Sequence, residues 1–188
     1  MGNKRNLKNI NVNKIDADSF GESLLFCAPQ AKDFCRYIDI KIARMAHVSF
    51  IPWTSAGYQY DQIIDSIYDK TQLINLYNIF VDWYKRLDEK QKRLYKAYFI
   101  RKSGKIYQEI MQKNYRKDRF IIPMIHSFIN YIQIKLDFEA RELIKNPYIY
   151  STYIKVRKNN KKALRKNKGG SRHDNSANER CDCCCLRN

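Results

Sequence analysis

The feature that most constrains the fold is the stretch of residues 60–86, which contains neither glycine nor proline. Its apolar residues recur at alternating steps of three and four, the period of one side of an α-helix. We therefore predict one long helix at residues 60–86. Apolar residues at these steps form a seam that extends one residue beyond the predicted helix. The seam consists of Leu73, Leu76, Phe80, Trp83 and Leu87.

A second apolar row beside this seam, formed by Ile74, Tyr77, Val81 and Tyr84, makes the apolar stripe wide. A wide stripe indicates burial on two sides, which favours one core helix of a bundle. An alternative interpretation is that the Leu73–Leu87 seam joins two copies of the chain in a homodimer. Both interpretations place the helix at the centre of an N-terminal helical region, residues 21–86.

Residues 87–146 also have a helical pattern. Asp88 and Gln91 have the spacing of a capping box and so predict a helix start, and Gly104 suits the left-handed residue that ends a helix. A short helix at 105–113, a basic turn and a longer helix ending near Asn146 complete the pattern. No stretch alternates as a strand would, so we predict an all-α helical bundle.

The charge is strongly positive, with 36 Lys and Arg against 19 Asp and Glu and a net charge of +17. Residues 1–20, rich in Asn and Lys, are expected to be a mobile arm. Residues 147–188 are expected to be a disordered basic tail that ends in the Cys181–Cys185 cluster. Consecutive cysteines cannot all reach one tetrahedral ion, which favours a reduced, metal-free end of the tail over a structural zinc site. The apolar runs are too short to span a membrane, and we expect a cytoplasmic protein.

Residues 87–136 follow the order helix, glycine-containing turn, short helix, basic turn, long helix, which is the plan of a helix-turn-helix. Leu94, Tyr95, Tyr98 and Phe99 form an apolar-aromatic helix end, and Tyr107–Met111 has a Glu-Ile core. In these residues the chain resembles region four of sigma-70-type factors and the related ArpU-type phage late-transcription regulators. The resemblance implies a transcription regulator that binds double-stranded DNA, with RNA polymerase as a candidate partner.

The candidate DNA contacts are cationic or amide side chains. They lie in the basic turn and its margins, in the longer helix after it, which is the predicted recognition helix, and in the tail. Arg and Asn can pair with base edges, whereas Lys113 and Lys117 are better placed for phosphate. Ile121, Ile125, Phe128 and Ile132 are expected to form the buried face of the recognition helix. The full set of candidate contacts is Lys113, Arg116, Lys117, Arg119, His126, Asn130, Lys155, Arg157, Lys158, Lys161, Lys162, Arg165 and Lys166.

Two other functions stay open at this point: a nonspecific nucleic-acid-binding protein, and a helical module that binds an acidic protein partner. We do not expect an enzyme or a cofactor. The three histidines are scattered and there is no phosphate-binding glycine loop. Asp61, Asp65 and Asp69 share one face of the long helix, which is more typical of a solvated acidic stripe than of a two-metal centre.

Overall fold

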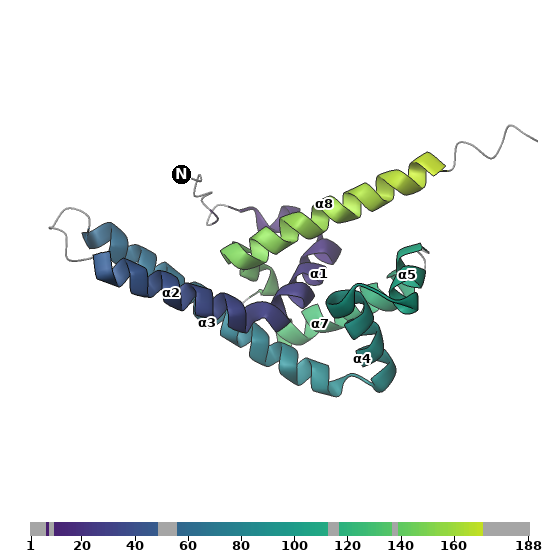
Figure 1. Cartoon of the computed structure of the whole chain (residues 1–188), viewed down its shortest axis with the longest axis horizontal. Coiled ribbons are helices and arrows are strands. Elements are labelled where there is room, and N and C mark those ends of the chain that lie inside the picture. Colours follow the sequence, from purple (N-terminus) through teal and green to yellow (C-terminus); the bar gives the residue numbers. More distant parts are fainter. Residues whose placement is uncertain (1–6, 8–9, 49–55, 113–116, 137–138, 171–188) are drawn as a thin grey trace, which may run out of the picture.

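The computed structural model describes residues 7, 10–48, 56–112, 117–136 and 139–170, and within these ranges the chain is helical without a strand (Figure 1). The all-α prediction is confirmed. None of the described helices has the length and apolar character needed to cross a membrane. The elements are η2 (Val12–Lys14), α1 (Ala17–Cys27), η3 (Ala28–Gln30), α2 (Ala31–Val48), α3 (Ala56–Arg86), α4 (Glu89–Tyr95), η4 (Lys96–Arg101), α5 (Lys105–Gln112), η5 (Lys117–Ile121), α7 (Ile122–Lys135), η6 (Ala140–Lys145) and α8 (Pro147–Gly170).

Helix α3 is the long helix that the sequence predicts, and it pairs with α2 in a hairpin that extends away from the other helices (Figure 1). Its seam is buried: no seam residue from Leu73 to Leu87 is more than 8% exposed. The seam packs inside this single chain, where the Trp83 and Phe128 rings lie 4.9 Å apart. The alternative interpretation, a homodimer through Leu73, Leu76, Phe80, Trp83 and Leu87, does not hold, because the chain's own helices already cover these side chains.

Helix α4 begins as predicted, with a capping box between Asp88 and Gln91. Its continuation η4 ends at Lys102, which has φ +50°, so the left-handed cap lies two residues before the expected Gly104; Gly104 itself has φ +90°. The aromatic end of this segment enters the core. Tyr95 is fully buried, stacks on Phe99 at 5.1 Å and donates a hydrogen bond to the carbonyl of Leu25 in α1 (3.2 Å).

The long helix predicted to run to Asn146 ends at Lys135 and is followed by the 3-10 helix η6. Pro123, which would disrupt a helix interior, lies in the first turn of α7, where its missing N–H costs nothing. Asn146 is not the end of the helical region, because α8 begins at the next residue, Pro147. The Asn146 side chain accepts the Tyr148 N–H (3.1 Å) and donates to the Asp69 carbonyl (3.0 Å).

Both predicted flexible ends are partly ordered helix. The expected mobile arm is helical from Ala17, where the Asp16 side chain accepts the Ser19 N–H (3.1 Å), and Phe20 is buried. The expected disordered tail is helical from Pro147 to Gly170, because Ile149 and Tyr153 pack into the core beside α1. The Cys181–Cys185 cluster lies outside the described residues.

Helices α1 and α7 cross closely at Gly21. A Cβ atom at this position would overlap Cγ2 of Ile125 and lie 2.5 Å from Cδ1 of Ile129. Ile125 is fully buried and cannot swing away. Glycine is therefore required here by packing.

We expect Gly21→Ala to lower the free energy of unfolding by about 1–3 kcal/mol through overpacking. Glycine to alanine in a helix otherwise gains up to about 1 kcal/mol, so the sign of the change is diagnostic. Urea titration of the variant and of the exposed control Ser151→Ala measures it. A more stable Gly21→Ala protein would contradict the close crossing of α1 and α7.

Candidate nucleic-acid interface

Helix α8 carries the largest uninterrupted concentration of positive charge in the described chain: eight Lys and Arg residues and no Asp or Glu. Its first half is fixed by the buried side chains of Ile149, Tyr153 and Val156. Its second half projects past the other helices (Figure 1). A basic segment that composition alone would assign to a flexible tail is thus presented on an anchored helix.

The cations of α8 gather on one side of it. At 100° per residue they fall within about half of the helix circumference, opposite the side that holds Tyr153, Val156 and Asn160. Arg157 is half-buried, and the other members with described side chains are exposed; the side chains of Arg165, Lys166 and Lys168 are outside that description. We call this the α8 basic face: Lys155, Arg157, Lys158, Lys161, Lys162, Arg165, Lys166 and Lys168.

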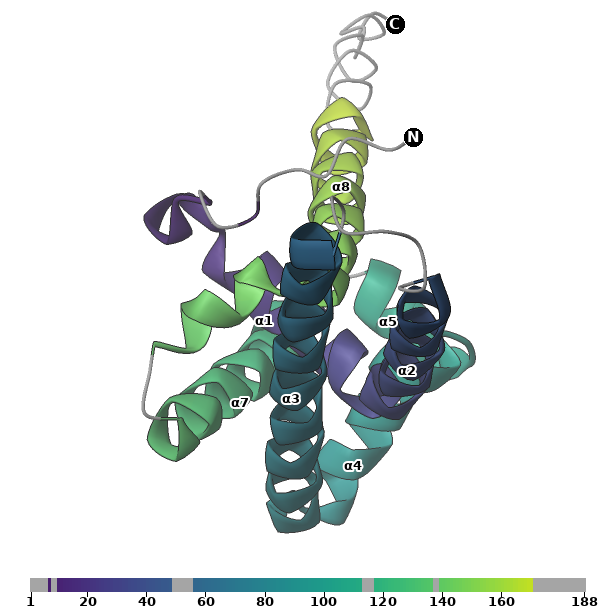
Figure 2. The same cartoon turned by 90° about the vertical axis from the view of Figure 1, so that its left-hand side faces the viewer.

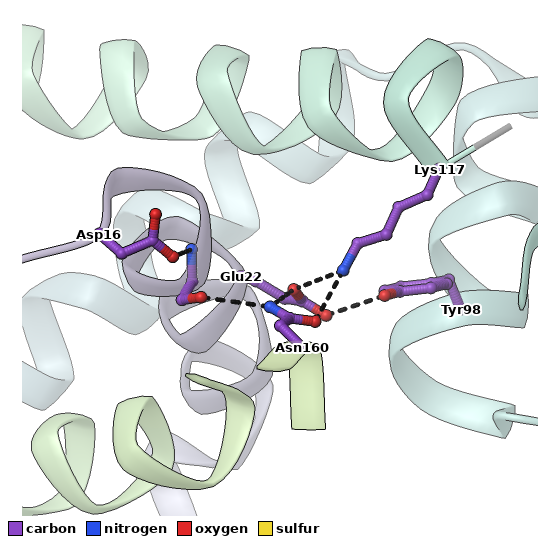
Figure 3. Close-up of polar contacts among 6 residues, drawn as sticks. Asp16, Glu22, Tyr98, Lys117 and Asn160 are labelled. Carbon is purple, nitrogen blue, oxygen red and sulfur yellow. Dashed lines mark hydrogen bonds and ion pairs between the residues drawn. The ribbon is translucent and has the colours of Figure 1, made fainter. Parts of the chain in front are cut away.

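A polar network holds α8 against the rest of the chain (Figure 3). At its centre is the carboxylate of Glu22 in α1, a residue only 4% exposed. Glu22 accepts hydrogen bonds from the Tyr98 hydroxyl (2.9 Å), from Nζ of Lys117 (3.1 Å) and from Nδ2 of Asn160 (3.0 Å). Burial, with the negative charge of Glu22, raises the pKa of Tyr98, so this hydroxyl remains a donor. We call these four residues the Glu22 network.

Lys117 therefore has a different role from the predicted phosphate contact. Its ammonium group is turned inward, where it neutralises Glu22 and also donates to Oδ1 of Asn160 (2.9 Å). A cation already paired with a buried carboxylate is costly to withdraw for a ligand. The same contacts place the beginning of η5 beside the middle of α8.

The remaining candidates near α7 are dispersed. Arg119 is exposed, with its guanidinium 5.6 Å from the centre of the Phe120 ring, and Asn130 is also exposed. His126 has Nε2 3.0 Å from a carboxylate oxygen of Asp18, so it is not directed solely at solvent. Lys113 and Arg116 lie outside the described residues. The predicted buried face of α7, from Ile121 to Ile132, is buried.

Helix α5 corresponds to the short helix that the sequence predicts at residues 105–113. Ile110 is buried, whereas Ile106 and Met111 are exposed. The short helix rests on η4, where the Tyr98 and Tyr107 rings are 6.0 Å apart. Helix α5 is therefore only partly buried: Ile110 faces the core, and Ile106 and Met111 face outward.

A cleft of about 420 Å³ opens beside the Glu22 network, between α1, η4, α5 and α8. Lys102, Lys117 and Lys155 line it together with Tyr107 and the network's own side chains. Three cations against the single carboxylate of Glu22 leave the cleft positive. It extends the positive surface of α8 toward α5.

The acidic residues of α3 do not form a metal centre in the described structure, where no group of three potential ligands comes together. Asp69 departs from the expected solvated stripe. Its carboxyl is partly buried, and this burial, together with the neighbouring Asp65, raises its pKa to about 6. With this pKa the Asp69 carboxyl is still mostly ionised at pH 7 and takes up a proton as the pH falls through about 6.

Comparison with protein-family models, with curated proteins and with solved structures finds no match for this chain. The functional assignment therefore depends on the surface of this chain itself. Sequence reasoning found the cations of α8 but missed Glu22 and Asn160. Neither belongs to a local motif, and the chain brings them together from positions 138 residues apart.

We expect Lys117→Met to lower the free energy of unfolding by about 3 kcal/mol, because it leaves the buried Glu22 carboxylate without its counter-charge. Arg119→Met, two residues away and exposed, should change stability by less than about 0.5 kcal/mol. Adding Glu22→Gln to Lys117→Met should restore part of the loss. Equal stability of Lys117→Met and Arg119→Met, measured by urea titration, would contradict the inward position of Lys117.

Proposed function

We propose that the protein binds duplex DNA through the α8 basic face and acts as a transcription regulator. The observation that carries this proposal is the run of eight cations without an acid along α8, a helix anchored in the core, where Lys155, Lys158, Lys161 and Lys162 are exposed. Phosphate neutralisation by Lys and Arg supplies most of the affinity of DNA-binding proteins.

The dimensions of α8 suit a duplex. The cations from Lys155 to Lys168 span roughly 20 Å of helix axis at 1.5 Å per residue. An α-helix with its side chains is about 10–12 Å wide, and the major groove is about 12 Å wide. A helix that is basic over half of its circumference can contact phosphates on both walls of such a groove.

The exposed groups that can read bases lie outside the α8 basic face. The bond from Lys117 to Asn160 holds η5, which carries Arg119, at the side of α8 away from that face, and Asn130 lies on α7. Arg pairs with guanine O6 and N7, and Asn with adenine N6 and N7, so Arg119 and Asn130 are the readout candidates. The resemblance to sigma-like regulators adds RNA polymerase as the protein partner in this function.

The proposal is tested by the salt dependence of DNA binding. We expect the triple variant Lys158→Ala, Lys161→Ala, Lys162→Ala to bind more weakly to every duplex. Each lost phosphate contact should lower the slope of log affinity against log salt by about 0.9. The matched control removes three exposed lysines elsewhere, with Lys85→Ala, Lys90→Ala and Lys96→Ala. Equal slopes in the two triple variants would contradict binding through α8.

The same titrations separate a regulator from a nonspecific binder. On a duplex selected from genomic fragments, Arg119→Ala should cost about 1–3 kcal/mol, and on a scrambled duplex much less, because a base contact is lost only on the selected site. A parent protein that binds selected and scrambled duplexes equally would overturn the regulator and leave nonspecific binding.

A further inference from the structure

The cleft beside the Glu22 network has the size of a small-molecule site. Its volume of about 420 Å³ lies within the range of about 300–1,000 Å³ that is usual for ligand pockets. Residues of α1, η4, α5 and α8 line it, and in both Figure 1 and Figure 2 α5 lies below α8. These elements are far apart in the sequence, so the cleft is formed by the folding of the whole chain.

Part of the lining is aromatic and apolar. The rings of Phe26, Tyr98 and Tyr107 line the cleft, and those of the two tyrosines lie 6.0 Å apart. Ile110 and Met111 of α5 continue this surface, and Met111 is 49% exposed. An unbranched methionine beside a tyrosine ring offers an adaptable surface on which a flat ring can pack.

The cleft also holds positive charge that the chain does not neutralise. Lys102 and Lys155 are exposed and line it, and in the part of the chain that the structure describes neither ammonium group is paired with a carboxylate. The carboxylate in the lining belongs to Glu22, which already pairs with Lys117 (3.1 Å). Two positive charges therefore remain for an anion.

The residue types in the lining favour a phosphate. All three cations that line the cleft are lysines, and arginine is not among its described lining residues. Arginine suits the flat fork of a carboxylate, whereas lysine binds phosphate as a point charge. The exposed amides of Gln30 and Asn159 also line the cleft, and such amides can pair with the edge of an adenine ring.

We propose that this cleft binds a free mononucleotide. The base lies against Tyr107 and Met111, and the phosphate lies between Lys102 and Lys155. Because the Glu22 network fixes α8 against α1, the cleft is already formed when the nucleotide arrives. This site is separate from the surface assigned to DNA and does not depend on DNA binding.

Isothermal titration calorimetry of the full chain with adenosine monophosphate (AMP), adenosine and inorganic phosphate tests the proposal. We expect AMP to bind at least about tenfold more tightly than adenosine or phosphate, because the cleft holds both parts of one molecule. Lys102→Met should raise the dissociation constant of AMP by about tenfold or more and leave that of adenosine unchanged. The matched control is Lys105→Met, an exposed lysine outside the lining, which should bind AMP like the parent.

Because Lys102 also ends η4, a second variant tests the cleft from its other side. Ala163 of α8 is exposed and lines the cleft. A carboxylate there should repel the phosphate, so we expect Ala163→Glu to weaken AMP by about tenfold or more, unlike the control Ser151→Glu on the same helix. Urea titration of each variant shows that the chain remains folded.

Three results would overturn the proposal: AMP that binds no more tightly than inorganic phosphate, equal affinities of Lys102→Met and Lys105→Met, or equal affinities of Ala163→Glu and Ser151→Glu. The triple alanine variant of α8 separates this site from the DNA surface and should bind AMP like the parent. Loss of AMP binding in that variant would mean that the nucleotide binds to the α8 basic face and would equally overturn the proposal. The lysines replaced in it lie outside the lining: Lys158, Lys161 and Lys162.

Discussion

The buried carboxylate of Glu22 is the interaction on which the rest of the structure depends. A charge in the interior is tolerated only when it is paired and fully hydrogen-bonded, and Glu22 obtains its partners from three other parts of the chain. Tyr98 comes from η4, Lys117 from η5 and Asn160 from α8. Helix α1 therefore holds the beginning of the α7 segment and the middle of α8 in fixed positions. An apolar contact would not specify those positions as narrowly.

The anchoring of α8 by the Glu22 network determines which way the cations of this helix face. Without an anchor, a segment as basic as residues 155–168 repels itself and samples many orientations. Held by Ile149, Tyr153 and Asn160 on one side, it presents its cations on the other. The ordering cost is met during folding instead of during association, which is how a preorganised surface gains affinity. The DNA-binding proposal rests on this arrangement more than on net charge.

Local periodicity predicted α3, the capping box of α4 and the buried face of α7, because each depends on residues within a few turns of one another. It could not decide what a seam packs against, because the Leu73–Leu87 seam of α3 is covered by other helices of this same chain, α7 among them. It also treated Lys117 as a surface cation, since its partner Glu22 lies 95 residues earlier. The helical structure of α8 was missed for the same reason. Its composition shows only that it is basic, whereas its anchoring depends on contacts with α1, which is distant in the sequence.

Amide hydrogen exchange along α8 tests most directly whether this helix is anchored. If the Glu22 network and the buried apolar residues hold it, the amides from Tyr153 to Asn160 exchange through global unfolding, with protection close to that of Leu73–Phe80 in the core of α3. Replacing Glu22 by Ala should then reduce protection in α8 more than in α3. Exchange of residues 153–160 at the rate of an unstructured chain in the parent protein would contradict the account.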